Sequence, residues 1–296
     1  MKRFTLIFAA LSLSLAFAEE RTWTSSDGRT LRAELLSYNI EAERVTIKTS
    51  ANKEFTLPFD KISEEDRAYL RELAEKEKAK LEELKKAAAE KAGKSVKETT
   101  DAGNSFHVYY PQSYSLEKKP SVLILFSPGG GGAGIMRNFK QGADKLGWVL
   151  VGCDNLKNGQ DWDEGKVIFN DLLAAIEERV DPGRLYVGGM SGGAMRAYLY
   201  TAVIERPWKG VIACGGWLGG GKNHELKFTK KMAVAIVNGD TDKNANLYIE
   251  STKKVFERRG GKVEVIMFPG GHTVGPPDVI EKAMTFVHEN TNTDED

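Results

Sequence analysis

Residues 189–193 read Gly-Met-Ser-Gly-Gly and place Ser191 between glycines at a change of secondary structure. The stretch follows an apolar run at 184–187 and precedes helix-forming residues at 194–200. A strand that turns sharply into a helix needs glycines beside its central residue, because Cβ atoms there would clash with the strained backbone. The Ser191 hydroxyl should therefore be exposed, and it could attack a carbonyl carbon if a base and an orienting acid lie beside it.

The candidate bases are the four histidines of the chain, His107, His224, His272 and His288. His107 lies in an alternating segment ahead of the serine, and His288 lies in the last helical pattern. His272 follows an apolar strand and a Pro-Gly-Gly turn, and it opens the loop before that last helix. A strand-end histidine downstream of the serine has the placement expected of a general base. We therefore assign the base to His272, with His224 in a glycine-rich loop as the alternative.

Two aspartates, Asp240 and Asp242, are the only ones between Ser191 and His272. They follow the apolar run 232–237 in the sequence Asn-Gly-Asp-Thr-Asp. One of them should accept a hydrogen bond from the second ring nitrogen of the histidine, which selects the tautomer and stabilises the imidazolium. The other should be a turn or capping residue, because aspartate after glycine commonly ends a strand and caps the next helix.

The chain order serine, aspartate, histidine, each at a strand end, resembles that of the α/β-hydrolase family. Residues 181–194 look most like the polyhydroxybutyrate-depolymerase and feruloyl-esterase-like branch, and the resemblance covers about residues 104–290. It implies an α/β fold with a doubly wound, mostly parallel sheet. In that family the acid usually lies three residues after the strand-end glycine, which carries over to Asp242 in preference to Asp240.

The family also implies an oxyanion hole built from two backbone N–H groups. One donor would be Gly192, the residue after the nucleophile. The second would come from the loop after the strand 123–126, which reads Ser-Pro-Gly-Gly-Gly-Gly. The family commonly has histidine at the position of Pro128, and this departure changes the loop without removing a backbone donor. We expect Gly130 to be the second donor, with Gly131 as the alternative.

The glycine run at 129–132 could instead cradle a phosphate, but two patterns argue against nucleotide binding. A Walker loop needs lysine and Ser or Thr directly after the glycines, whereas this chain continues Ala-Gly-Ile. A dinucleotide fingerprint needs an acidic residue at the end of a second strand, and Asp154, the nearest candidate, does not lie in a convincing βαβ unit. No organic cofactor and no metal is implied.

Residues 1–18 have the pattern of a secretory signal. Lys2 and Arg3 precede an apolar run at 4–15, and Ala-Phe-Ala precedes Glu19 as a small-residue cleavage site. The apolar run is shorter than a membrane span of about 20 residues, and no later segment is apolar enough to cross a bilayer. We therefore expect an exported protein, periplasmic or extracellular, with no membrane span after cleavage.

The two cysteines, Cys153 and Cys214, raise the question of a disulfide in an exported protein. They end strands that the family's sheet order places three strand spacings apart. At about 4.8 Å per spacing their separation would be roughly 14 Å, beyond the limit of about 7 Å between Cα atoms of a bridged pair. We expect two buried thiols.

Charge and length limit the partners and the number of domains. Lys and Arg number 42 and Asp and Glu number 42, so no basic field attracts nucleic acid or acidic lipid. A length of 296 residues allows about two domains. We expect a small domain at 19–72, a charged helical linker at 73–97, a larger domain at 98–290 and an acidic tail at 291–296.

Residues 19–72 show short alternating strands at 21–24, 31–38, 44–49 and 54–59, the pattern of a small β-barrel. Residues 23–29, together with Leu57-Pro58 and residues 63–66, resemble the SLA homology domain, an SH3-like fold. The resemblance covers about residues 20–72 and leaves the ligand of this domain unknown.

Residues 63–66 also resemble a capping box and should start a long helix. Its apolar stripe is thin among lysines and glutamates, which favours a solvated spacer over a coiled-coil dimer.

The substrate follows least directly from the sequence. Only a short segment separates Ala213 from Met232, where the family usually inserts a lid, so the site should be open and suited to short, polysaccharide-linked or polyester esters. Trp162 and Trp217 follow strand ends on the same side and could stack on a ring, although both could equally be packing residues. The sequence thus favours an exported serine esterase. A peptidase of the same fold and a non-catalytic binding protein on this scaffold are the alternatives.

Overall fold

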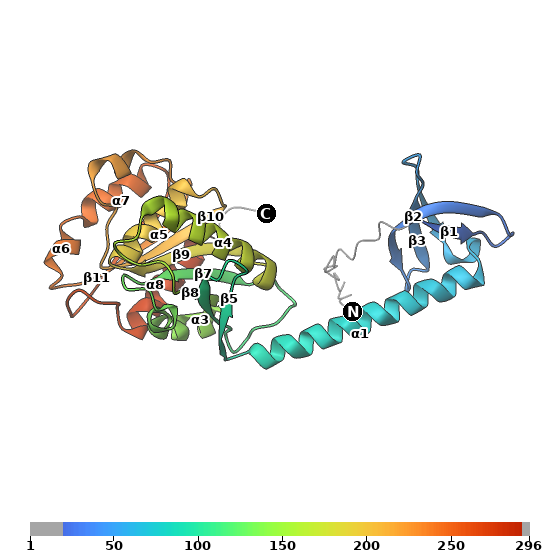
Figure 1. The fold of residues 1–296 in the computed structure, drawn as a ribbon, viewed down its shortest axis with the longest axis horizontal. Helices are drawn as coiled ribbons and strands as arrows, with labels where there is room; N and C mark the ends of the chain where they lie inside the picture. Colours follow the sequence, from blue (N-terminus) through green and yellow to red (C-terminus); the bar gives the residue numbers. More distant parts are fainter. Residues whose placement is uncertain (1–19, 292–296) are drawn as a thin grey trace, which may run out of the picture. The chain divides into compact units, whose positions relative to one another are not determined.

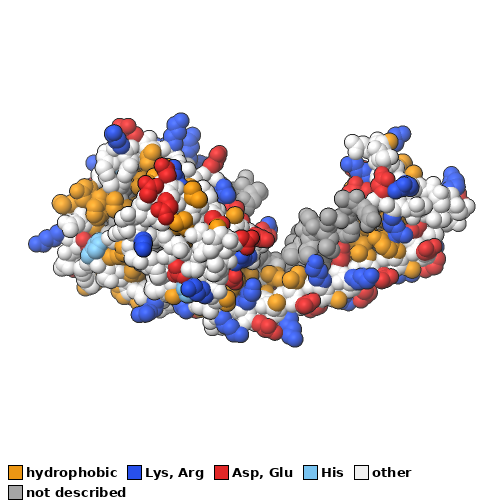
Figure 2. All heavy atoms as spheres, viewed as in Figure 1, with side chains coloured by type: hydrophobic (Ala, Val, Ile, Leu, Met, Phe, Trp, Pro, Cys, Tyr) orange, Lys and Arg blue, Asp and Glu red, His pale blue; other side chains and the backbone are white. Residues whose placement is uncertain are grey.

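The computed structural model describes residues 20–291. The expected signal segment at 1–18 lies outside this range, as does the acidic tail beyond Thr291. The chain divides into two compact units between Leu84 and Lys85 (Figure 1). No helix within residues 20–291 combines the length and the apolar character needed to cross a bilayer. Basic and acidic side chains are interspersed over the face shown in Figure 2.

The first unit contains a four-stranded antiparallel sheet in which the strands pair in chain order. Its strands are β1 (Arg21–Thr24), β2 (Thr30–Asn39), β3 (Arg44–Lys48) and β4 (Glu54–Pro58), followed by the 3₁₀ turn η1 (Phe59–Lys61). The predicted alternation has a clear structural outcome, because Val45 and Ile47 are fully buried while their neighbours in β3 are not. Trp23 closes the same core and donates its indole N–H to the carbonyl of Ala33.

Helix α1 (Glu64–Lys91) starts as the capping pattern predicted. The amide of Asp66 donates to Oγ of Ser63, and the Ser63 hydroxyl donates to the Asp66 carboxylate. That carboxylate also accepts hydrogen bonds from the guanidinium of Arg21 and the amide of Thr24, which fixes the helix start to β1. Leu70 is buried in the core of this unit, so the first turns of α1 pack against this sheet.

The second unit is built on an eight-stranded sheet with the order β12-β11-β10-β9-β7-β8-β6-β5. The strands from β12 to β8 are parallel, and β6 and β5 are antiparallel to their neighbours. In chain order they are β5 (Ser95–Thr99), β6 (Ser105–Tyr109), β7 (Ser121–Phe126), β8 (Val149–Cys153), β9 (Arg184–Met190), β10 (Trp208–Cys214), β11 (Ala233–Gly239) and β12 (Lys262–Phe268). The doubly wound, mostly parallel sheet is as predicted. The sheet begins at Ser95, however, ahead of the limit expected at residue 98, because β5 pairs with β6 and covers its edge.

Helices cover both faces of this sheet (Figure 1). They are α2 (Gly132–Met136), η2 (Arg137–Phe139), α3 (Lys140–Leu146), α4 (Trp162–Val180), α5 (Gly192–Val203), η3 (Gly221–Glu225), α6 (Lys243–Asn246), α7 (Ile249–Glu257) and α8 (Pro277–Asn290). Along β7, Ile124 belongs to a core cluster that includes residues of α4, α5 and α7, whereas Leu123 belongs to a second cluster with residues of α2, α3 and α8. Burial on both faces explains why these strands read as continuous apolar runs.

Cys153 and Cys214 are both free and buried, as predicted. They end β8 and β10, which are separated in the sheet by β7 and β9. Burial raises the pKa of both thiols, to about 12 for Cys214, so the protonated and unreactive form prevails at neutral pH.

Candidate active site

Ser191 lies in a sharp turn between β9, which ends at Met190, and α5, which begins at Gly192. Its backbone has φ 55° and ψ −123°, a strained combination for a residue with a side chain. The turn passes so close to β7 that a Cβ at Gly189 or Gly193 would lie 2.5 or 2.1 Å from the carbonyl oxygen of Phe126. These two glycines are therefore required by the approach of a neighbouring strand. The serine is presented where the parallel strands end.

His272 and Asp242 complete a continuous chain of hydrogen bonds with Ser191. Nε2 of His272 is 2.9 Å from Oγ of Ser191, and Nδ1 is 2.7 Å from Oδ2 of Asp242. The Asp242 side chain is only 4% exposed, whereas that of His272 is 45% exposed. A buried carboxylate thus holds the Nδ1 edge of an imidazole ring that is otherwise partly open to solvent. This geometry lets the imidazole accept the serine proton while the carboxylate stabilises the resulting cation.

The two aspartates after β11 have different partners. Oδ1 of Asp240 accepts a hydrogen bond from the amide of Gly270, in the turn just ahead of His272. Oδ1 of Asp242 accepts from the amide of Ala245 and so caps α6, while its other oxygen faces the histidine. Asp240 therefore shapes the loop, and Asp242 combines capping with orientation of the ring.

The remaining histidines lie elsewhere. His107 on β6 is 3.3 Å from the carboxylate of Asp154. His288 on α8 packs edge-on against Trp148, and partial burial lowers its pKa. His224, the alternative base, lies in η3. Within residues 20–291, His272 is the histidine that hydrogen-bonds to Ser191.

The glycine loop after β7 contains the two candidates for the second oxyanion donor, Gly130 and Gly131, and their amides differ in hydrogen bonding. The amide of Gly130 donates to the carbonyl of Ser127 at 3.3 Å, so it is engaged within the loop. Gly131 has φ +78° and lies directly before α2. Within the part of the chain that the structure describes, its amide has no hydrogen-bond acceptor. The loop's internal hydrogen bonding thus favours Gly131 over Gly130 as a donor to a ligand, together with Gly192 at the start of α5.

A buried asparagine, Asn238, supports the loops that carry the acid and was not identified from the sequence. It is fully buried in β11, accepts a hydrogen bond from the amide of Gly215 and donates to the side chain of Asn246. Asn246 in turn donates to the carbonyl of Gly239. A Cβ added at Gly215 would lie 3.3 Å from the Asp242 carboxylate, so this network adjoins the acid. A polar residue in an otherwise apolar strand was the available signal.

Replacing Asn238 by alanine should lower the free energy of unfolding by about 1 to 3 kcal/mol, because a buried hydrogen-bonded amide is lost and its partners remain. Urea unfolding monitored by circular dichroism measures this change. Asn170→Ala on the exposed face of α4 is the control, and it should change stability by less than about 0.5 kcal/mol. Equal midpoints for the two variants would contradict the role of the network.

The two tryptophans named from the sequence have different surroundings. Trp162 begins α4 and packs against the core, with its ring centroid 5.2 Å from that of Tyr200. Trp217 stacks on Tyr248 with ring centroids 4.9 Å apart and planes at 14°. A Cβ at Gly216, its neighbour in the chain, would lie 2.8 Å from the carbonyl of Ser191. The backbone that precedes Trp217 therefore lies beside Ser191, whereas Trp162 is a packing residue.

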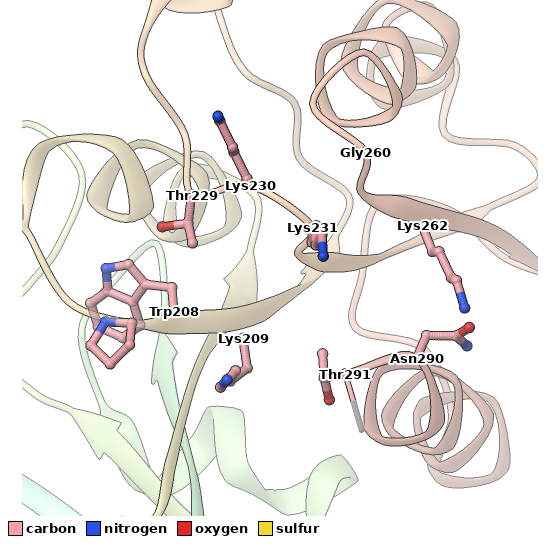
Figure 3. A pocket seen from close by; sticks show the side chains of 10 residues that line it. Trp208, Lys209, Thr229, Lys230, Lys231, Gly260, Lys262, Asn290 and Thr291 are labelled. Carbon is pink, nitrogen blue, oxygen red and sulfur yellow. The ribbon is translucent and has the colours of Figure 1, made fainter. Parts of the chain in front are cut away.

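A separate pocket of about 380 Å³ opens at the start of β10, with lysines around it (Figure 3). It is lined among others by Lys209 of β10, Lys231 just ahead of β11 and Lys262 of β12. Because these residues lie where parallel strands begin and Ser191 follows the end of β9, this pocket is not the site of the triad.

Solved structures with the same fold include known esterases. Esterase PE8 matches with a TM-score of 0.51 and 19% identity over 66% of this chain and 99% of that chain. Est1E from Butyrivibrio proteoclasticus matches with a TM-score of 0.52 and 14% identity over 66% and 98%. YahD with malic acid matches with a TM-score of 0.51 and 16% identity over 63% and 99%. No protein-family model and no curated protein matches the chain. The second unit therefore has the α/β-hydrolase fold.

Proposed function

We propose that this protein is a serine hydrolase that cleaves carboxylic esters. The observation that carries the proposal is the unbroken Ser191–His272–Asp242 chain on a strained strand-to-helix turn, with contacts of 2.9 and 2.7 Å. A hydroxyl, an imidazole and a buried carboxylate in this order are the parts needed for nucleophilic acyl transfer. The fold shared with esterases agrees with this chemistry but does not by itself carry it.

The reaction uses each side chain in turn. Oγ of Ser191 attacks the ester carbonyl carbon while Nε2 of His272 takes the hydroxyl proton. The carbonyl oxygen becomes negative and is held by the amides of Gly192 and Gly131. Collapse of this tetrahedral species breaks the bond to the alcohol, which leaves with the proton from His272. Water then attacks the acyl-enzyme by the same route, which releases the acid and restores Ser191.

The substrate class follows from the surface beside the triad. Only loop and the short η3 lie between β10 and β11, so no lid domain covers the site from there. Trp217 and Tyr248 form a stacked aromatic pair, and Tyr248 is 40% exposed. Leu247 beside it is 76% exposed. An open site flanked by a half-buried tryptophan stacked on an exposed tyrosine suits short acyl groups on an aromatic or sugar ring better than long apolar chains.

Replacing Trp217 by alanine should lower kcat/KM for a feruloyl ester, or another ester that carries an aromatic ring, by about three- to ten-fold. The reason is that an aromatic contact is worth about 0.5 to 1.5 kcal/mol. Hydrolysis of an alkyl acetate should change much less, because it offers no ring. Trp162→Phe is the control and should leave the ratio of the two activities unchanged. If Trp217→Ala lowered both activities equally, the aromatic pair would not contact the substrate ring.

The first experiment is labelling of the full chain with a fluorophosphonate, followed by a panel of esters and peptides. Labelling that requires Ser191, together with ester cleavage, supports the proposal. Cleavage of peptides alone would indicate a peptidase of the same fold, and folded protein that takes up no label would indicate a non-catalytic binding protein.

We propose in addition that the protein is exported and that residues 19–72 form an SLA homology, SH3-like domain. The signal pattern at 1–18 supports export, and the antiparallel sheet β1–β4 with its core around Trp23 agrees with a small SH3-like domain. Amino-terminal sequencing of secreted protein should begin at Glu19. Full-length protein retained in the cytoplasm would contradict export.

A further inference from the structure

Asp154 makes three polar contacts directly after β8. Its Oδ1 accepts a hydrogen bond from the amide of Gly132 at 2.7 Å. Its Oδ2 accepts one from the hydroxyl of Ser105 at 2.9 Å and lies 3.3 Å from Nε2 of His107. The side chain is only 17% exposed. A carboxylate this well enclosed connects β6 to the glycine loop.

The glycine loop lies against the end of β8 without side chains between them. A Cβ at Gly132 would be 1.9 Å from the carbonyl oxygen of Gly152, and one at Gly130 would be 2.5 Å from the carbonyl oxygen of Asp154. The carbonyl of Pro128 accepts a hydrogen bond from the amide of Asn158. The segment 152–158 therefore supports the loop through its backbone. The Asp154 carboxylate adds a side-chain contact, the hydrogen bond from the amide of Gly132.

We propose that Asp154 is a positioning residue for the oxyanion hole. By holding the amide of Gly132, its carboxylate sets the direction of the preceding peptide, which carries the N–H of Gly131. Two amides stabilise an oxyanion only when both lie within about 2.7 to 3.1 Å of it. The inference rests on the proposed esterase function and assigns Asp154 no contact with the substrate.

The charge state of the acceptor explains why an aspartate suits this place. A carboxylate has two oxygens that only accept, so it can take the Gly132 amide on one and the Ser105 hydroxyl on the other. An asparagine would turn an NH₂ group toward one of these donors. The glycine loop would then be held less tightly, although asparagine and aspartate have nearly the same volume.

The test compares Asp154→Asn with a matched variant, Asp171→Asn, in the full chain. Asp171 is also a partly buried carboxylate with two side-chain donors, Thr100 and Asn104, but it does not contact the glycine loop. For Asp154→Asn we expect kcat on nitrophenyl acetate to fall by about ten- to a hundred-fold, less than the loss of a whole oxyanion donor, with KM within about two-fold. Asp171→Asn should leave kcat within about two-fold.

The affinity for a trifluoromethyl ketone distinguishes positioning of the oxyanion hole from a general effect on stability. Ser191 Oγ adds to its carbonyl carbon while the hydroxyl proton passes to Nε2 of His272 and the C=O π electrons move to the oxygen. The tetrahedral oxyanion forms without expelling a leaving group, so the affinity of the ketone reports the oxyanion hole. For Asp154→Asn this affinity should fall by the same factor as kcat, while the thermal midpoint falls no more than in Asp171→Asn. Unchanged kcat and ketone affinity would overturn the inference, as would equal losses in the two variants.

Ser105→Ala serves if Asp154→Asn does not fold. It removes one donor to the Asp154 carboxylate without touching the loop, and kcat should fall by about two- to five-fold at constant KM. No change in kcat for a folded Ser105→Ala variant would count against the inference. Wild-type protein that neither cleaves esters nor binds the ketone would instead refute the esterase proposal itself.

Discussion

Alanine at Ser191 should reduce turnover of nitrophenyl acetate by about 10⁴- to 10⁶-fold, since removal of a triad nucleophile leaves only binding and the oxyanion hole. The strained turn should survive, because the glycines at 189 and 193 that allow the approach to Phe126 are unchanged. The substitution removes one hydroxyl and no packing contact with the core. Activity should therefore fall without a matching fall in stability.

Initial rates with a chromogenic acetate and thermal unfolding of the same preparations measure these two quantities. Ser113→Ala, at an exposed position, is the control and should behave as wild type in both. A Ser191→Ala protein that keeps more than about one hundredth of the wild-type rate would mean that another group is the nucleophile.

The second large effect concerns the acid. Asp242→Asn should lower turnover by about 10³- to 10⁴-fold, because an amide NH₂ facing Nδ1 favours the wrong histidine tautomer. Asp240→Asn is the matched variant, because the Asp240 carboxylate accepts a hydrogen bond from the amide of Gly270, whereas the Asp242 carboxylate faces the His272 ring. Its effect should be below about ten-fold, arising from a looser turn ahead of His272.

Parallel measurement of kcat for the two asparagine variants decides between the acids. A greater loss in Asp240→Asn than in Asp242→Asn would show that the resting geometry, with Oδ2 of Asp242 2.7 Å from Nδ1 of His272, is not the working one.

Local rules were enough to predict the turn at Ser191 and the strands around it. The glycines at 189 and 193 mark a turn that few other residues can adopt, and apolar runs such as 123–126 mark strands buried on both faces. Each of these inferences depends on contacts whose steric demand is visible in a few neighbouring residues.

Other features required the folded chain. The limit expected at residue 98 falls within the edge strand β5 (Ser95–Thr99), because its place in the sheet depends on pairing with β6. Trp162 and Trp217 look alike in sequence, yet one packs against the core and the other stacks on Tyr248. A residue's neighbours in space, and not its own type, decide whether it packs or binds.

The sequence by itself determined the turn that presents Ser191, the chain order of the three candidate residues and the apolar runs that form strands buried on both faces. Only the tertiary structure decided that Asp242 faces His272, that Gly131 rather than Gly130 has an unused amide, and that Asp154 holds the glycine loop. The reason is physical. Backbone strain and burial patterns are local properties of the chain, whereas the acceptor of a hydrogen bond is chosen by segments far apart in sequence that meet where the strands end.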